Sequence, residues 1–229
     1  AGDGVEALQL VRSHVPDIIV SDVMMPRMNG YELCKTIKED IAISHIPVIL
    51  LTAKDDKQSL ISGYKNGADG YLSKPFEVEM LMELIRNRLK NREYTKKRYL
   101  NAGLIPTPEE STISLTDETF LIKLNSIIQE NIDNTNLGIQ FICQEVGLGR
   151  SSLYNKLKAL TGMGANEYIS KLRIEKAITL ISGTDMPFSE IAEKTGFTTP
   201  SYFSTTFKQY TGETPSQYKE RKKKGLTDQ

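Results

Sequence analysis

Residues 189–218 read SEIAEKTGFTTPSYFSTTFKQYTGETPSQY, and this stretch decides the fold of the carboxyl-terminal half of the chain. An apolar helical face breaks at Gly196, and a second helix then resumes with apolar residues spaced four apart. Residues 142–162, ICQEVGLGRSSLYNKLKALTG, repeat this pattern about 50 residues earlier, with Gly147 in the place of Gly196. The sequence therefore predicts a helix-turn-helix that occurs twice. We call residues 142–162 the first copy and residues 189–218 the second copy.

The segment between the two copies, residues 165–182, has the apolar periodicity of one long helix. Its ~18 residues would span ~27 Å, close to the ~34 Å that separates successive major-groove faces of B-form DNA. Two second helices held apart by such a strut could enter adjacent turns of the duplex. The expected buried stripe of the strut consists of Tyr168, Ile169, Leu172, Ile174, Ala177, Ile178 and Ile181.

The exposed positions on the second helix of each copy are the ones that could touch DNA. Arg binds guanine and Asn binds adenine through paired hydrogen bonds, so Arg150 and Asn155 are expected to read bases. Ser, Thr and Tyr more often contact phosphates, so the second copy is expected to hold the DNA backbone. The predicted DNA-binding residues are Arg150, Ser151, Tyr154, Asn155, Lys158, Ser201, Tyr202, Ser204, Thr205 and Lys208. The alternative is a helical protein-interaction domain whose surface is merely polar.

The second copy also carries a specific set of short motifs. They are FSEIA at 188–192, TGF at 195–197, SYFS at 201–204, FK at 207–208 and TGETPSQY at 211–218. With these motifs, residues 115–221 resemble the AraC-type transcription regulators. The resemblance implies a module that docks two helices in consecutive major grooves of double-stranded DNA. It also implies binding in pairs, as a homodimer on direct repeats, and contact with RNA polymerase.

Composition shows that affinity for DNA cannot come from bulk charge. The 229 residues leave room for about two domains with their own cores. Because 29 basic and 29 acidic residues cancel, positive charge must act through local placement. The candidates are Lys156, Lys158, Lys171, Arg173, Lys208 and the run 219–224, which could equally be a solvated tail. Neither a disulfide nor a zinc site is expected from the two cysteines and two histidines. No signal peptide or long apolar run is present, which favours a cytoplasmic location.

The amino-terminal half alternates short apolar runs with helical patterns. The runs are 17–20, 48–51 and 70–72, and helices are expected at about 3–13, 31–38, 57–66 and 78–90. Strands without polar alternation that alternate with helices predict a parallel sheet covered on both faces. The predicted fold class is therefore an α/β domain followed by an all-α tandem helix-turn-helix domain.

A polar side chain stands at the end of each predicted strand. These side chains are Asp22, Thr52 and Lys74, and ligands bind beyond the carboxyl ends of strands in such sheets. A carboxylate, a hydroxyl and an ammonium at one place suit a phosphoryl group. Asp22 would accept the group, Lys74 would supply the countercharge and Thr52 would donate a hydrogen bond to a phosphate oxygen. Each residue alone is a common strand cap, but their coincidence at three strand ends favours the functional interpretation.

This half resembles the receiver domain of two-component response regulators, which has a flavodoxin-like fold. The resemblance is carried by residues 17–30, 47–53 and 67–76. It implies that a histidine kinase phosphorylates Asp22, that Mg²⁺ is required and that the Met24 carbonyl joins Asp22 in the metal shell. Thr52 and Tyr71 would form the switch pair, and Lys74–Pro75 would be a cis peptide bond.

The sequence departs from the receiver pattern at its start. Receivers open with a strand that ends in paired acidic residues for Mg²⁺, followed by a helix and a second strand, and these segments are absent before residues 17–20. In the strand order 2-1-3-4-5 the strand at 17–20 loses its central partner, so we expect it to be an exposed edge. We therefore expect a receiver truncated at its amino terminus, without the remaining acidic Mg²⁺ ligands.

The junction between the halves completes the predicted organisation. The last receiver helix is expected to continue towards Tyr99, and a new helix to begin near Thr116, capped by its hydroxyl, with Asp117 and Glu118 at the positive end of the helix dipole. The predicted domains are a receiver at 1–99, a linker at 100–115 and an AraC-type domain with a basic tail at 116–229. The expected core of the new helix is Phe120, Leu121, Leu124, Ile127 and Ile128.

The predicted function is a phosphorylation-controlled, sequence-specific transcription regulator of a two-component system, and not an enzyme. The order of domains also resembles the carboxyl-terminal end of hybrid sensor proteins, which would place a membrane anchor upstream. The alternative is a phosphatase of the haloacid-dehalogenase type, which also uses a strand-end Asp. That class requires a second Asp two residues after the nucleophile, where Met24 stands in this chain.

Overall fold

A computed structural model of the chain describes residues 1–53, 67–101 and 114–227, with the side chains of 98–101 and 224–227 left aside. The chain forms two compact units, residues 1–121 with 151–162 and residues 122–150 with 163–229. The helix expected at 57–66 and most of the predicted linker lie outside the described residues. None of the described helices is both long and apolar enough to cross a membrane.

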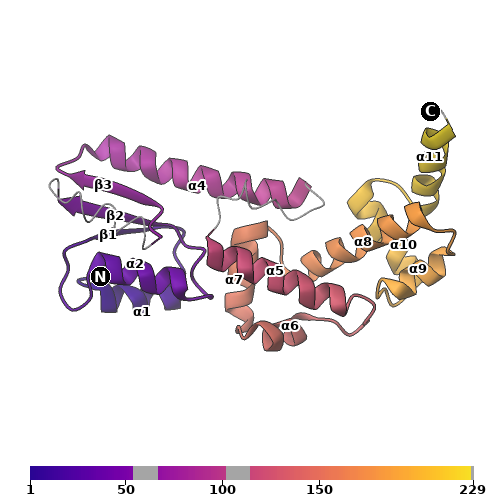
Figure 1. The fold of residues 1–229 in the computed structure, drawn as a ribbon, viewed down its shortest axis with the longest axis horizontal. Coiled ribbons are helices and arrows are strands. Elements are labelled where there is room, and N and C mark those ends of the chain that lie inside the picture. Colours follow the sequence, from indigo (N-terminus) through magenta and orange to yellow (C-terminus); the bar gives the residue numbers. More distant parts are fainter. Residues whose placement is uncertain (54–66, 102–113, 228–229) are drawn as a thin grey trace. The chain divides into compact units, whose positions relative to one another are not determined.

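Three parallel strands form the sheet of the amino-terminal half (Figure 1). They are β1 (Ile19–Asp22), β2 (Val48–Ala53) and β3 (Gly70–Lys74), in the order β1-β2-β3. β1 begins two residues later than predicted and includes Asp22, because the Ile19 N–H donates to the Pro47 carbonyl at 2.8 Å and the ladder continues to Val23. Within the described residues β1 has no neighbour on its other side, which confirms the predicted exposed edge.

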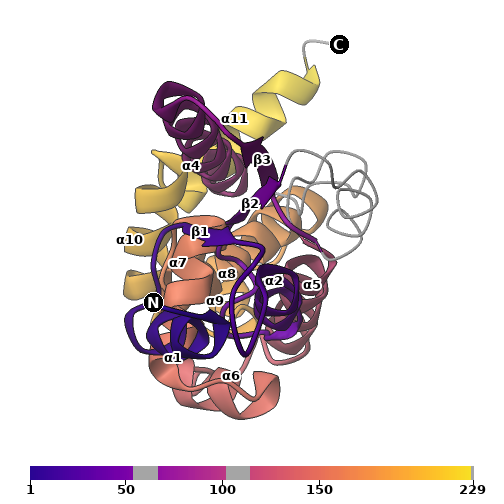
Figure 2. The ribbon, with the colours of Figure 1, turned by 90° about the vertical axis from the view of Figure 1, so that its left-hand side faces the viewer.

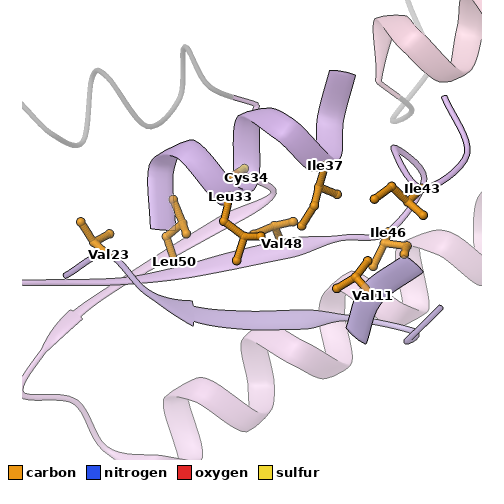
Figure 3. Packing of buried hydrophobic residues seen from close by; sticks show 9 residues of the cluster. All are labelled: Val11, Val23, Leu33, Cys34, Ile37, Ile43, Ile46, Val48 and Leu50. Carbon is orange, nitrogen blue, oxygen red and sulfur yellow. The ribbon is translucent and has the colours of Figure 1, made fainter. Parts of the chain in front are cut away.

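Helices cover both faces of this sheet. α1 (Gly4–His14) and α2 (Gly30–Glu39) lie on one face and α4 (Val78–Asn101) lies on the other (Figures 1 and 2). Figure 3 shows Leu33 and Ile37 of α2 against Val48 and Leu50 of β2, all four fully buried. Alternate β2 side chains point to opposite faces, so one strand supplies both packing surfaces. α4 runs on past residue 99, as the sequence predicts.

The start of α2 is fixed against the end of β1. Asn29 and Glu32 form a reciprocal capping box, in which each side chain accepts the backbone N–H of the other. A Cβ atom at Gly30 would lie 2.3 Å from the Asp22 carbonyl oxygen. Glycine therefore lets α2 begin directly against the strand that carries Asp22.

Helices make up most of residues 114–227, and they confirm the duplicated pattern (Figure 1). The helices are α5 (Leu115–Glu130), α6 (Ile139–Val146), α7 (Arg150–Thr161), α8 (Ala165–Gly183), α9 (Phe188–Lys194), α10 (Pro200–Thr211) and α11 (Pro215–Thr227). The turn glycines Gly147 and Gly196 have φ angles of 74° and 72°, a conformation that favours glycine. The first copy thus lies in α6 and α7, and the second lies in α9, α10 and the start of α11.

Aromatic rings form the core of the second copy. Phe197, Phe203, Phe207 and Tyr218 follow one another with ring centroids 5.3, 5.7 and 5.6 Å apart. The rings are tilted or edge-to-face, the arrangements that aromatic pairs prefer. They pack with buried residues of the strut, here α8, whose predicted stripe is buried except for the half-buried Leu172 and Ile178.

The predicted cap of α5 is wrong. The cap is Ser114, whose hydroxyl accepts the Asp117 N–H at 3.2 Å, whereas the Thr116 hydroxyl donates to the Lys38 carbonyl at 2.9 Å. The basic run at 219–224, for which the sequence left two interpretations open, is part of α11. A hydroxyl one or two positions from a helix start can cap it or bond elsewhere, and only the tertiary partner decides between these roles. The five predicted core residues of α5 are all buried.

A buried ion pair connects α5 to α7. The Lys156 ammonium, 0% exposed, contacts the Asp117 carboxylate, 4% exposed, and it donates to the Ser44 hydroxyl at 2.8 Å. The Ser44 hydroxyl donates to the same carboxylate at 2.7 Å, and Lys156 lies 5.0 Å from the Phe120 ring centroid. Burial opposes ionisation of Asp117, but Lys156 and the hydrogen bonds outweigh it and hold the pKa of the carboxyl below its usual value. Each buried charge therefore compensates the other for the loss of contact with water.

Removal of one partner from this pair should be more damaging than removal of both. We expect Asp117→Ala to lower the free energy of unfolding by about 3–5 kcal/mol, because it leaves the Lys156 ammonium buried without a counter-charge. Asp117→Ala combined with Lys156→Met should cost clearly less. Urea denaturation measures both variants. Additive losses in the double variant would contradict a buried, coupled pair.

Candidate functional site

Parallel pairing brings three predicted site residues together at the carboxyl ends of the strands. Asp22 is in register with Leu51 of β2, and Ala53 at the end of β2 is in register with Lys74 of β3. The Lys74 ammonium forms an ion pair with the Asp22 carboxylate, so it reaches across the end of β2. The sheet therefore sets the predicted acceptor and its countercharge face to face.

The electrostatic environment keeps Asp22 ionised. The Lys74 ammonium and the Met24 N–H, which donates to Asp22 Oδ1 at 3.1 Å, both favour the charged carboxylate. The hydrogen bond from Lys74 is the main cause that holds the pKa of Asp22 below its usual value. The Asp22 side chain is 38% exposed, so a ligand from solvent can reach it. This carboxylate is charged and accessible, as a phosphoryl acceptor must be.

The remaining predicted receiver residues lie beside this pair. Thr52 is 3% exposed and stands in β2 one residue after the register partner of Asp22. Tyr71 of β3 is half-buried and packs against the apolar core, while Met24 is 81% exposed. The predicted cis peptide bond between Lys74 and Pro75 is present. The structure thus gathers Asp22, Thr52 and Lys74 at the carboxyl ends of the three strands. Tyr71 lies in β3, the strand that ends with Lys74.

The donor atoms at this edge bear on the expected Mg²⁺. The residues that the structure describes contain no group of three or more His, Cys, Asp or Glu side chains placed to hold a metal ion. Mg²⁺ is commonly held by one or two carboxylates together with water and phosphate oxygens. The exposed Asp22 carboxylate is an oxygen ligand of the kind that such a shell uses.

The predicted DNA-binding residues of the first copy lie on exposed parts of α7. Tyr154 is 55% exposed, Arg150, Ser151 and Lys158 are also exposed, and Asn155 is half-buried. The Arg150 guanidinium donates to Gln140 Oε1 of α6 at 3.4 Å, a long hydrogen bond. Such a contact holds Arg150 near the helix start and is weak enough to be exchanged for a base.

The second copy presents its predicted residues on α10. Tyr202 is 53% exposed, Ser201, Thr205 and Lys208 are exposed, and Ser204 is half-buried. The Thr199 hydroxyl caps this helix by accepting the Tyr202 N–H at 3.1 Å, and Pro200 is the first helical residue. The cap fixes the helix end that carries Tyr202.

Two residues that the sequence suggested as sources of positive charge for DNA are buried. Lys156 is enclosed with Asp117, and Arg173 of α8 is 9% exposed. Burial lowers the pKa of the Arg173 guanidinium, and its Nη2 donates to the Asn134 carbonyl at 2.7 Å. Neither can face a phosphate, so the prediction is wrong for both. Sequence periodicity did not reveal this, because the residues that enclose each cation are distant in sequence.

Comparison with known proteins assigns each half separately. Residues 1–86 match the family model described as a response regulator receiver domain. Residues 142–221 match a model described as a helix-turn-helix domain, and this range contains both copies.

Three relatives carry similar sequences. "Histidine kinase P4" of Formosa agariphila is 42% identical over 221 residues, which are 96% of this chain and 16% of that protein. The chain therefore spans about a sixth of the length of that relative. "Probable transcriptional regulator ycf29" of Pyropia yezoensis is 32% identical over 178 residues, 73% of this chain and 80% of that protein. "Transcriptional regulatory protein HptR" of Staphylococcus aureus is 29% identical over 220 residues, 95% of this chain and 85% of that protein.

The ion pair at the sheet edge predicts a change in the titration of Asp22. We expect Lys74→Met to raise the pKa of Asp22 towards its usual value, because the variant loses the hydrogen bond and the charge that favour the carboxylate. Carboxyl carbon chemical shifts followed against pH by NMR measure this. The control is Lys35→Met, which removes an ammonium that pairs with the exposed Glu39. An unchanged Asp22 titration in Lys74→Met would show that the two groups do not interact in solution.

Proposed function

The chain belongs to the response regulators that join a receiver domain to an AraC-type helix-turn-helix domain, and on this basis we propose that phosphorylation of Asp22 controls its binding to specific DNA sequences. The observation that carries the proposal is the Lys74–Asp22 ion pair. It places the proposed acceptor beside its countercharge, at the solvent-exposed carboxyl ends of the strands. The same chain carries two helix-turn-helix copies with exposed second helices.

The phosphoryl group would come from a histidine kinase. An oxygen of the Asp22 carboxylate forms a bond to phosphorus while the bond from phosphorus to the kinase histidine nitrogen breaks, and that nitrogen keeps the electron pair. Lys74 then faces the new phosphoryl oxygens, and the Thr52 hydroxyl would donate to one of them. The Asp22 carboxylate and the Met24 carbonyl would hold Mg²⁺, which when bound would supply positive charge beside the phosphoryl oxygens.

The signal would leave the receiver through its last strand. When Thr52 turns towards the phosphoryl group, the half-buried Tyr71 would move into the space beside it and change the surface of β3. Such a change alters how two receivers pair, and pairing raises the local concentration of two DNA-binding domains. The chain would thus act in the cytoplasm as a homodimer on DNA and contact RNA polymerase from there.

The two copies would divide the contacts with DNA. Arg150 and Asn155 of α7 have the side chains that pair with guanine and adenine. On α10, Ser201, Tyr202 and Thr205 are suited to phosphates, and Lys158 and Lys208 add charge to the two helices. The phosphatase alternative has no support from the matching families, and Met24 stands where that class needs its second Asp.

The switch is tested with a small acyl phosphate as phosphodonor and a DNA fragment found by footprinting. We expect the wild-type chain to gain mass by one phosphoryl group and its apparent DNA affinity to change about 10- to 100-fold, because pairing adds avidity. Asp22→Asn should show neither effect. Asp17→Asn is the control, since this exposed carboxylate lies at the other end of the strand. A response to phosphodonor in Asp22→Asn equal to that of the wild type would refute the proposed switch.

The division of DNA contacts is tested with two variants on one panel of single-base operator changes. Arg150→Ala should relax preference at one base pair by about 1–3 kcal/mol. Lys208→Ala should weaken binding to all sequences alike and reduce the salt slope by about 1. Lys176→Ala, which removes an exposed cation of α8, is the control. Fluorescence anisotropy titrations measure all three, and identical profiles for Arg150→Ala and Lys208→Ala would contradict the division.

A further inference from the structure

Arg173 lies where three segments of the second compact unit meet. Its own helix is α8, and its Nη2 donates to the Asn134 carbonyl in the connection between α5 and α6 at 2.7 Å. The guanidinium carbon lies 6.0 Å from the centroid of the Phe197 ring, in the turn between α9 and α10. One side chain therefore contacts both the segment that leads into the first copy and the turn of the second copy.

The burial of this guanidinium is unusual. Arg173 is 9% exposed, and within the described residues its buried Nε has no hydrogen-bond partner. A buried cation is costly unless hydrogen bonds and polarisable neighbours compensate it. Here the Asn134 carbonyl and the face of Phe197 supply part of that compensation, and both depend on the two segments staying in place. A planar guanidinium can stack its face on a ring while its fixed fork of N–H groups donates in the plane, and a lysine ammonium lacks this planar face.

The turn glycine of the second copy forms the other side of this junction. A Cβ atom at Gly196 would lie 2.3 Å from the Ile132 carbonyl oxygen and 2.7 Å from Arg173 Nη2. At Gly147, the matching glycine of the first copy, a Cβ atom would meet nothing within 4 Å. Both glycines have nearly the same positive φ, so only their surroundings differ. The two copies share a turn, but only the turn of the second copy is pressed against another segment.

The junction also reaches an exposed residue of α10. The Phe197 ring packs edge-on against the ring of Tyr202, with centroids 5.7 Å apart. Tyr202 is one of the proposed DNA contacts and is 53% exposed. A change in the position of Arg173 would therefore be passed through one ring to the surface that faces DNA.

We propose that Arg173 is a positioning residue: it clamps the turn of the second copy against the α5–α6 connection and so fixes the spacing of the second copy from α6 of the first. This inference rests on the proposed function for its consequence at DNA, but the clamp itself is a property of the chain alone. The length of α8 alone limits only how far the second copy lies from the start of that helix. The clamp would also prevent α9 and α10 from rotating about the end of α8.

The first test measures the clamp without DNA. Spin labels are placed on α5 and α10 through Ser126→Cys and Gln209→Cys, both exposed, in the 229-residue chain with Cys143→Ser. Cys34 stays unlabelled, since burial raises the pKa of its thiol to about 12. We expect one narrow distance distribution in the wild type, and a broadened one in Arg173→Met and Arg173→Lys. Lys176→Met, on the same helix, should leave the distribution narrow.

The glycine pair gives a matched control. Gly196→Ala should shift or broaden the same distribution, and Gly147→Ala, which suffers the same φ penalty, should not. A narrow, unshifted distribution in Arg173→Met and Gly196→Ala would overturn the clamp, as would equal broadening in Gly147→Ala. If circular dichroism shows Arg173→Met to be unfolded, Arg173→Lys is judged by the same readout, because it keeps the charge and the alkyl chain.

The second test measures the consequence at DNA. The DNA used is the segment that footprinting assigns to one bound chain. Arg173→Met should bind this DNA about 10- to 100-fold more weakly, because the second copy is no longer held in one position. A two-base-pair insertion between the parts of the site should weaken the wild type strongly and Arg173→Met little. Equal sensitivity of both proteins to the insertion would overturn the spacing role. If the wild type binds no DNA, the proposed function fails, and the label distances still decide the clamp.

Discussion

The ion pair between Lys74 and Asp22 is the interaction on which the receiver half depends, because it can form only if three parallel strands end together. β2 lies between β1 and β3, which carry the two partners, so the ion pair depends on the register of all three strands. Gly30 completes the arrangement from the other side, since only a residue without Cβ lets α2 begin against the Asp22 carbonyl. The packed sheet and helix thus hold a charged carboxylate at an edge that remains open to solvent.

The helical half uses one motif twice but gives the two copies different surroundings. Leu153 and Leu157 fill the core positions of the first copy, where Phe203 and Phe207 stand in the second. The aromatic core extends through neighbouring rings to Phe197 and there meets a buried cation, a contact that leucine could not make. The two copies therefore differ in the segments that they contact, whereas the backbone conformation of the turn glycine is nearly the same in both.

Most of the fold could be predicted, because it depends on local signals. Apolar runs located the three strands, and the turn glycines located both helix-turn-helix copies. The strand-end rule also gathered Asp22 and Lys74 correctly, since parallel strands share an edge. The errors share one cause, which is a partner distant in sequence. Ser114 rather than Thr116 caps α5 because the Thr116 hydroxyl bonds to Lys38, and no window of sequence around Thr116 contains that information.

The same cause changes how the charge of the chain must be understood. Basic and acidic residues are equal in number, and Lys156 and Arg173 lie inside the protein, so fewer cations remain for the surface than the sequence suggests. Lys158 and Lys208 occupy matching positions in the last turns of α7 and α10 and are exposed. A cation there is also stabilised by the helix dipole, so its position alone does not identify a DNA contact. Because the net charge is zero, attraction to DNA cannot come from bulk charge, and under the proposed function it must come from the exposed residues placed on α7 and α10.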